Sequence, residues 1–510
     1  MTRSSLLTGF VLLVSLDFSV YSQTPGPLPK PFFFPGSTVG VLPSNSISHL
    51  VSINGMLWAG TGNGLARSND GGRSWTGYSA NPEFARPGIF SIAVRGDTVW
   101  ASTGYSKDVS GASVQTGSGS TYTIDNGITW HGIPQPLDPL NDSAVVYGSN
   151  TIHFLPIVVP EQNVTFNSAI TDSAVWIASW SSGLRKSTDL GSTWQRIVLP
   201  SHNRSSIAPT DTLGNYSIDP RNDNNYLAFS VAAVGDDTIW TGTAGGINRS
   251  FDGGRSWLHF TADNEAAHIG SDWVLAIAAQ RLGTRTRIWA TNWPAEGPTQ
   301  VYATSYTDDG GLTWSNHLIG TKSYGFAFKD SIAYVAAGDG IYRTNDGGTT
   351  WLKSGTIIDP ATGNRITSSA FFSVAVIGDS VFGASDDGLA RTIDNAVHPF
   401  GTAWEIVRSF VPSQTTANVY AYPNPFSPGF GSARIHYTTG ATPGTVTIEL
   451  FDFGMNRLRT LLKDASRLGE SDEIWDGKDQ WSKTVVNGVY FYRVTISNGT
   501  PAWGKILVLQ

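Results

Sequence analysis

The chain has no cysteine among its 510 residues, only three methionines, and charged side chains at only 14% of its positions. The absence of cysteine excludes a disulfide framework, a cysteine-ligated zinc site, an iron–sulfur cluster and a thiol nucleophile. The net charge of −7 comes from 33 basic and 40 acidic residues. Because nucleic-acid binding needs a basic surface, no nucleic-acid partner is predicted. No uninterrupted apolar run reaches the ~18 residues of a membrane helix, so we expect no membrane span in the mature chain.

Residues 1–22 have the pattern of a secretory signal peptide. Arg3 supplies the positive start, and the mostly apolar segment from Leu6 to Leu16 is too short to span a bilayer. Val20 and Ser22 fit the small-residue rule for cleavage before Gln23. The sequence therefore predicts an exported protein, secreted or held at the cell surface.

Glycine and tryptophan are abundant, at 56 and 18 residues, and much of this abundance comes from one repeat. The repeat reads Ser/Thr-x-Asp-x-Gly-x-Ser/Thr-Trp, and we call it the box. Intact copies occupy Ser68–Trp75, Thr123–Trp130, Ser187–Trp194, Ser250–Trp257, Thr307–Trp314 and Thr344–Trp351. A seventh, interrupted copy begins at Thr392 and ends at Trp404. Such self-similarity is typical of a repeat architecture.

Each box follows three short apolar segments, so the repeating unit reads as four strands, A to D, with the box in the C–D turn. One such sheet buries little apolar surface alone, whereas seven stacked around an axis bury both faces of each. The sequence therefore predicts an all-β chain in which residues 23–410 form a seven-bladed β-propeller. The Asp and Ser/Thr residues of the box have a local structural role, because their oxygens can accept hydrogen bonds from the backbone of their own turn.

The box pattern is similar to the Asp-box (BNR) repeat family over roughly residues 40 to 410. That family includes sialidases, two-propeller xyloglucanases, sortilin-type receptors and the photosystem II assembly factor group. The resemblance implies a propeller whose ligand binds at the end opposite the boxes. It does not select one function, because the fold hosts several.

The B–C and D–A connections share the end opposite the boxes, and we look for a binding site there. Twelve tryptophans occupy repeated positions in the boxes and in strand B, whereas Trp180 and Trp293 lie on connections at this end. Exposed aromatic side chains there would stack on sugar rings or anchor a protein. The candidate ligand-binding residues are Tyr105, Trp180, Arg204, Trp293 and Glu296.

A secreted glycoside hydrolase, sialidase- or xyloglucanase-like, is the alternative. Glycosidases need two carboxyl groups about 5 to 9.5 Å apart, and Glu161, Asp211, Asp223 and Glu296 lie on suitable connections without any spacing that selects a pair. The Phe-Arg-Ile-Pro motif of sialidases is absent, and only one propeller fits. No catalytic residue, metal site or cofactor is predicted, and binding is favoured over catalysis. An envelope assembly factor is a second alternative.

A polar segment at 411–418 reads as a linker, and residues 419–510 read as about seven short strands, the size of a small β-sandwich. Landmarks are the Tyr-Pro-Asn-Pro-Phe run from Tyr422, the Trp-Asp-Gly run from Trp475 and the Asn-Gly turn at Asn487. This segment resembles the Ig-like module of the flagellar hook-capping protein and the type IX secretion sorting domain. The resemblance implies a role in sorting or attachment, with the outer-membrane secretion machinery as a partner. We therefore expect an exported propeller that binds a glycan or protein ligand.

Overall fold

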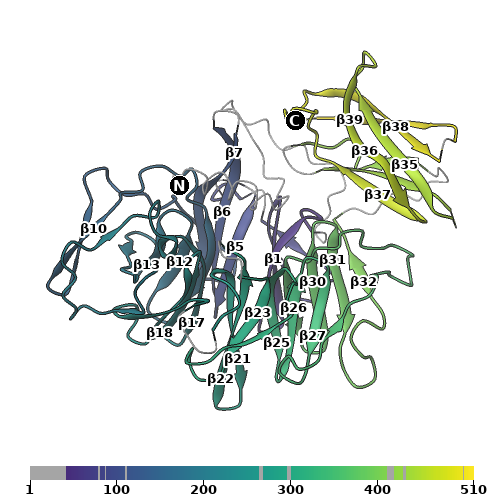
Figure 1. Ribbon diagram of the computed structural model, residues 1–510. Coiled ribbons are helices and arrows are strands. Elements are labelled where there is room, and N and C mark those ends of the chain that lie inside the picture. Colours follow the sequence, from purple (N-terminus) through teal and green to yellow (C-terminus); the bar gives the residue numbers. More distant parts are fainter. Residues whose placement is uncertain are drawn as a thin grey trace. The chain divides into compact units, whose positions relative to one another are not determined.

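The computed structural model describes residues 42–509, except for 79–80, 85, 87, 110–111, 264–267, 296–299, 410–418, 429–431, 441 and 498. The predicted signal peptide, the predicted linker and Glu296 lie outside the described residues. Residues 45–105 and 115–407 belong to one compact unit, and residues 408–509 belong to a second. Strands dominate both units (Figure 1), and the described part of the chain has a single short helix, the 3₁₀ turn η1 (Asn224–Tyr226).

Within the described residues, the first unit contains seven main sheets, built mostly from strands that follow one another in sequence, and one small additional sheet. We number the main sheets 1 to 7. Sheet 1 comprises β1 (Ile47–Ile53), β2 (Met56–Thr61), β3 (Gly64–Ser68) and β4 (Thr76–Gly77). Sheet 2 comprises β5 (Ile89–Arg95), β6 (Thr98–Val109), β7 (Ala112–Thr123) and β8 (His131–Ile133). Sheet 3 comprises β11 (Thr165–Ile170), β12 (Val175–Ser179), β13 (Gly183–Ser187) and β14 (Gln195–Arg196).

Sheet 4 comprises β17 (Ala228–Val234), β18 (Thr238–Thr243), β19 (Gly246–Ser250) and β20 (Trp257–Phe260), with β15 (Ser206–Ile207) on its outer edge. Sheet 5 comprises β21 (Trp273–Leu282), β22 (Arg285–Trp293), β23 (Ala303–Thr307) and β24 (Ser315–His317). Sheet 6 comprises β25 (Ser323–Lys329), β26 (Ile332–Ala337), β27 (Gly340–Thr344) and β28 (Leu352–Lys353). Sheet 7 comprises β29 (Ser373–Ile377), β30 (Ser380–Ser385), β31 (Gly388–Ile393) and β32 (Glu405–Val407).

The seven sheets form a closed ring. The first strand of each sheet packs against the first strand of the next, and β29 of sheet 7 packs against β1 of sheet 1. The amide of Leu50 donates a hydrogen bond to Ser373 Oγ (3.0 Å) across this junction. A ring of sheets stacked face to face is the arrangement of a β-propeller.

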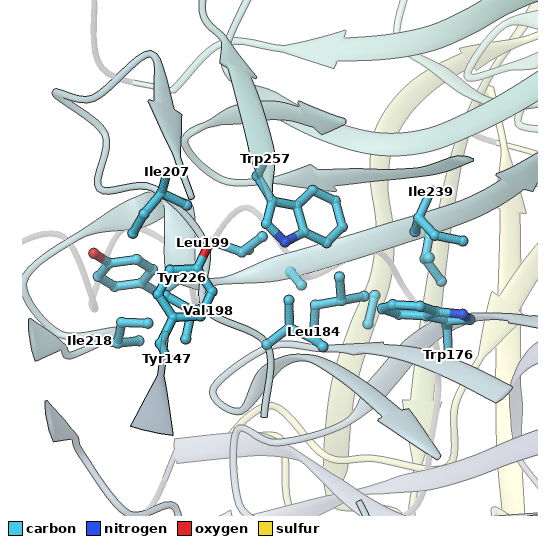
Figure 2. Close-up of a cluster of buried hydrophobic side chains, with 14 of the residues drawn as sticks. Tyr147, Trp176, Leu184, Val198, Leu199, Ile207, Ile218, Tyr226, Ile239 and Trp257 are labelled. Atoms are coloured by element: carbon cyan, nitrogen blue, oxygen red, sulfur yellow. The ribbon is translucent and has the colours of Figure 1, made fainter. Parts of the chain in front are cut away.

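Bulky side chains fill the space between neighbouring sheets. Figure 2 shows the cluster between sheets 3 and 4, in which Trp176 and Leu184 of sheet 3 meet Ile239 and Trp257 of sheet 4. The strand-B tryptophans are almost completely buried at Trp58, Trp100, Trp176, Trp240 and Trp289. These residues are structural, as the repeat predicts.

The boxes are self-contained turns. In the first box, Asp70 accepts hydrogen bonds from the amide of Ser74 (2.9 Å) and from its hydroxyl (2.5 Å). The hydroxyl of Ser68 accepts from the amide of Gly72 (2.8 Å), and Trp75 Nε1 donates to Gly72 O (3.0 Å). The bonds from Ser74 lower the pKa of Asp70 to about 2. The other intact boxes repeat the carboxylate contacts, so their Asp residues are turn-forming groups.

Long connections on either side of sheet 3 carry structure that the repeat does not predict. Strands β9 (Ala144–Tyr147), β10 (Asn150–Phe154) and β16 (Ser217–Ile218) form a small additional sheet, in which β10 and β16 are parallel. Ile152 and Ile218 of this sheet join the core cluster between sheets 3 and 4. The insertions are therefore packed parts of the first unit.

The second unit holds two sheets around one core. One comprises β33 (Val419–Tyr422), β34 (Ala433–Thr438) and β37 (Glu470–Trp475), and the other comprises β35 (Gly444–Phe451), β36 (Arg457–Arg467), β38 (Gly488–Ile496) and β39 (Ala502–Val508). Residues from both sheets form its buried cluster, including Ile435, Tyr437, Ile448, Trp475 and Val494. The peptide bonds Tyr422–Pro423 and Asn424–Pro425 are cis.

A titratable group on β1 makes the stability of the first unit depend on pH. Burial lowers the pKa of His49 to about 4, although a hydrogen bond to the backbone of Phe90 opposes the shift. Because the unfolded value is about 6.5, the unfolded chain binds more protons between pH 6.5 and pH 4, and the folded state loses stability as the pH falls through this window. We expect a loss of up to about 3 kcal/mol at pH 4.

Urea unfolding at pH 7 and pH 4 measures this loss, and His49→Gln should remove most of it. His153→Gln is the matched control, because His153 is exposed on the additional sheet. An equal pH response in the wild type and in His49→Gln would contradict the assignment.

Candidate ligand-binding face

The end of the first unit opposite the boxes carries a set of aromatic side chains at one repeated position. In sheets 2, 3, 4 and 6 the first strand contains a register shift near its start, and the extra residue is aromatic. Such bulges re-aim side chains out of the ordinary ladder. The bulged residues are Phe90, Phe166, Phe229 and Tyr324, and Phe372 lies directly before β29 of sheet 7. We call these five residues the collar.

Ring contacts connect members of the collar between sheets. Phe166 lies with its ring centroid 6.4 Å from that of Phe90 and 5.8 Å from that of Phe229. Tyr324 and Phe372 lie 5.5 Å apart in a T-shaped arrangement. Phe90, Phe166, Tyr324 and Phe372 are partly exposed, whereas Phe229 is buried. Burial raises the pKa of Tyr324 to about 12, so its hydroxyl is neutral at physiological pH.

Trp180 and Trp293 support the collar from beneath. The sequence predicts that both side chains are exposed, but they are only 7% and 3% exposed. The Trp180 ring lies 5.0 Å from that of Phe229, and the Trp293 ring lies 5.4 Å from that of Tyr324. Trp293 Nε1 also donates to Ser323 O (2.8 Å), so its polar edge is satisfied inside the unit. The expectation of exposure was wrong because collar residues cover these indoles.

Lys322 adds a cation next to the collar. Its ammonium group lies 4.3 Å from the ring centroid of Trp293, a cation–π geometry. Burial lowers the pKa of Lys322. The face therefore combines partly exposed aromatic rings with a positive charge.

Asp272 lies directly before Trp273, whose ring contacts those of Trp180 and Phe229. It accepts hydrogen bonds from the amide of Ala262 (2.7 Å) and from Gln300 Nε2 (2.8 Å), so it ties two connections together. Burial raises the pKa of Asp272 despite these bonds. Its hydrogen bonds give it a positioning role under the collar.

The structure places the remaining sequence-derived candidates outside the collar contacts. Tyr105 lies in β6 and is partly buried, with the Arg86 guanidinium 4.5 Å from its ring centroid. Arg204 lies in the connection between sheets 3 and 4, where it contacts Asp211 (3.5 Å) and lies over the ring of Tyr216 (5.8 Å). Glu296 lies outside the described residues.

The acidic residues that suggested a hydrolase have local partners. Asp211 accepts from the amide of Ala208 (2.9 Å), and Asp223 accepts from the amides of His202 and Asn225 (2.9 Å each). The backbone of Glu161 makes an isolated β-bridge with Thr116, which places the residue but does not engage its carboxylate. The contacts of Asp211 and Asp223 are typical of loop-stabilising carboxylates.

Sequence reasoning missed the collar although its signal is present. The segments Ile89-Phe90-Ser91, Thr165-Phe166-Asn167, Ala228-Phe229-Ser230, Ser323-Tyr324-Gly325 and Phe371-Phe372-Ser373 share an aromatic residue followed by a small or polar one. The recurrence of this pattern at the start of strand A in five sheets is the sequence signal of the collar.

Comparison with known proteins shows the fold alone. No protein-family model and no curated protein matches the chain. Among solved structures, YCF48 from Cyanidioschyzon merolae is 16% identical, with 68% of this chain and 95% of that chain covered and a TM-score of 0.41. An ancestral GH74 enzyme is 11% identical, with 92% and 62% covered and a TM-score of 0.50.

PorZ, a surface component of the type-IX secretion system of Porphyromonas gingivalis, is 12% identical, with 91% of this chain and 66% of that chain covered and a TM-score of 0.35. Of these three, the GH74 enzyme reaches a TM-score of 0.50, and its likeness agrees with the β-propeller fold that the strand order shows. Their low identities give no function to this chain. Among the described residues, no helix is long and apolar enough to cross a membrane.

Proposed function

We propose that this chain is an exported binding protein of the Asp-box type, with the seven sheets as the blades of one propeller and an Ig-like second unit. The collar carries the proposal. Its partly exposed aromatic side chains recur at one structural position, at one end of the ring of sheets. Exposed aromatic side chains stack on sugars or anchor a protein partner. The ligand is a glycan or a protein segment, and the structural partners of the Asp211 and Asp223 carboxylates do not favour hydrolysis.

The collar is tested by removing two of its rings. Tyr324→Ala combined with Phe372→Ala should weaken binding of the purified protein to its target on a glycan array or a peptide array about tenfold or more, because both rings would contact the ligand. Phe251→Ala is the control, since Phe251 is 57% exposed but lies in a box at the other end of the strands.

Two results would contradict this function. Unchanged binding by the collar variant, with correct folding shown by circular dichroism, would remove the site. Release of new reducing ends from a bound polysaccharide would instead support the hydrolase alternative.

We further propose that the second unit directs export to the cell surface or medium through the outer-membrane secretion machinery. Deleting residues 419–510 should then leave the propeller in the periplasm of the producing cell. Fractionation and immunoblotting measure this distribution, with the full-length chain as the control. Normal extracellular yield of the truncated chain would refute the sorting role.

A further inference from the structure

A cleft beside the outer strands of sheet 3 carries chemistry that neither the boxes nor the collar uses. It covers about 380 Å³ including its opening to solvent, and its enclosed part has room for only about one water-sized group, such as a single oxygen atom. Its walls are mainly apolar, with Phe154, Leu155, Leu199, Ile218 and Tyr226 among them. Several of these residues also belong to the cluster in Figure 2.

Two arginines and one aspartate lie at the polar side of this cleft. Arg185 on β13 and Arg196 on β14 are cross-strand neighbours. The side chains of Arg185, Asp138 and Arg196 are 3%, 5% and 7% exposed. Arg185 Nη2 donates to Asp138 (2.9 Å), which also accepts from the amide of Ile157 (2.9 Å). Arg196 Nη2 donates to Asp142 (2.6 Å), whose side chain is 48% exposed.

The deeply buried charges do not cancel. Two guanidinium groups face one fully buried carboxylate, while the carboxylate of Asp142 is half in water and is screened. A buried charge without a buried counter-charge is costly. A second carboxylate in the cleft would bring the buried set to neutrality.

Two unpartnered polar atoms belong to residues that line the same cleft. Arg185 Nε and Ser182 Oγ are buried, and neither has a hydrogen-bond partner among the residues that the structure describes. Each of them can donate to an acceptor oxygen, and unsatisfied buried donors are uncommon in native proteins. Arginine and hydroxyl donors together are suited to a carboxylate oxygen.

Arg185 is not part of the repeat. The residue after it, Lys186, occupies the repeated basic position on strand C and pairs with Trp176, as Arg67 pairs with Trp58. The position of Arg185 itself is occupied in other sheets by uncharged residues, namely Ala66, Asn248, Tyr342 and Ala390. The repeat therefore does not account for a buried arginine at this position of sheet 3.

We propose that this cleft binds a carboxylate carried on a short apolar body. The carboxylate accepts from Arg185 Nε and Ser182 Oγ, and the apolar body lies along Phe154, Leu155 and Ile218 toward the opening. The site is separate from the collar, so its failure would leave the proposed function unchanged.

Isothermal titration of the full chain with isovalerate tests the proposal, with isovaleramide as the uncharged isostere and N-acetyl-leucine as a mimic of a peptide C-terminus. We expect saturable, weak binding of an acid and none of the amide. Ser182→Ala should weaken binding of the acid about tenfold. Arg185→Lys, which keeps the cation beside Asp138 but removes Nε, should weaken this binding at least as much. Lys186→Gln, on the opposite face of β13, should bind normally.

The pattern of binding identifies the source of the carboxylate. Tighter binding of isovalerate points to a free acid, and tighter binding of N-acetyl-leucine points to a peptide terminus. Equal binding of the amide, no saturation by either acid at tens of millimolar, or unchanged affinity in folded Ser182→Ala would each overturn the site.

Discussion

Trp176→Ala should lower the free energy of unfolding of the first unit by about 3–5 kcal/mol, the cost of deleting a large buried aromatic side chain. The Trp176 ring is completely buried between sheets 3 and 4 (Figure 2), and Lys186 Nζ lies 4.9 Å from its centroid. The turn of the neighbouring box also packs onto this ring: a Cβ added at Gly254 would lie 2.5 Å from it. The substitution therefore leaves a cavity that rigid sheets on both sides cannot close.

Urea unfolding followed by circular dichroism measures this effect. Ile128→Ala is the control within the same unit, because Ile128 is 83% exposed in a box turn and should change stability by less than about 0.5 kcal/mol. A loss below about 1 kcal/mol for Trp176→Ala would show that the sheets can collapse onto the gap.

Asp138→Ala should lower the free energy of unfolding of the first unit by about 3–5 kcal/mol, because it leaves the guanidinium of Arg185 buried without its counter-charge. It also removes the acceptor for the amide of Ile157. Burial lowers the pKa of Arg185 even with Asp138 present, which shows how poorly this site is solvated. Equilibrium unfolding of the variant gives the cost directly.

The double variant Asp138→Leu with Arg185→Leu separates charge burial from lost packing. Removing both charges should recover more than half of the lost free energy of unfolding, since replacing a buried ion pair by apolar side chains is often neutral. Asp142→Ala is a milder control, because its partner Arg196 keeps the backbone acceptor Asp142 O (2.8 Å). Equal destabilisation of the single and double variants would mean that unpaired charge is not the cause.

The sequence predicts the all-β propeller because the box is a local device. Its hydrogen bonds join residues within four positions of one another, so the spacing of Ser68, Asp70 and Ser74 is enough to predict the turn. Repetition of that turn fixes the order of the strands around the ring. The repeat likewise predicts Trp58, Trp100 and Trp176 as core residues, and they are buried.

The candidate site could not be predicted to the same extent because it depends on contacts between sheets. Trp180 and Trp293 lie on the predicted connections, but Phe229 and Tyr324 cover them from neighbouring sheets, and no local pattern reports this. The cleft at Arg185 depends on Asp138, 47 residues away in an inserted segment. Insertions lack the repeat, so their packing cannot be read from it.

The closure of the ring bears on how such a chain can gain or lose length during evolution. Within the described residues, sheet 7 consists of β29 to β32 alone and takes no strand from the start of the chain. Among the described residues, the first and last sheets meet through packing of β1 against β29 and through contacts such as that from Leu50 to Ser373. Because each sheet is essentially one continuous stretch of chain, duplication or deletion of a single gene segment can add or remove a whole sheet without rethreading the others.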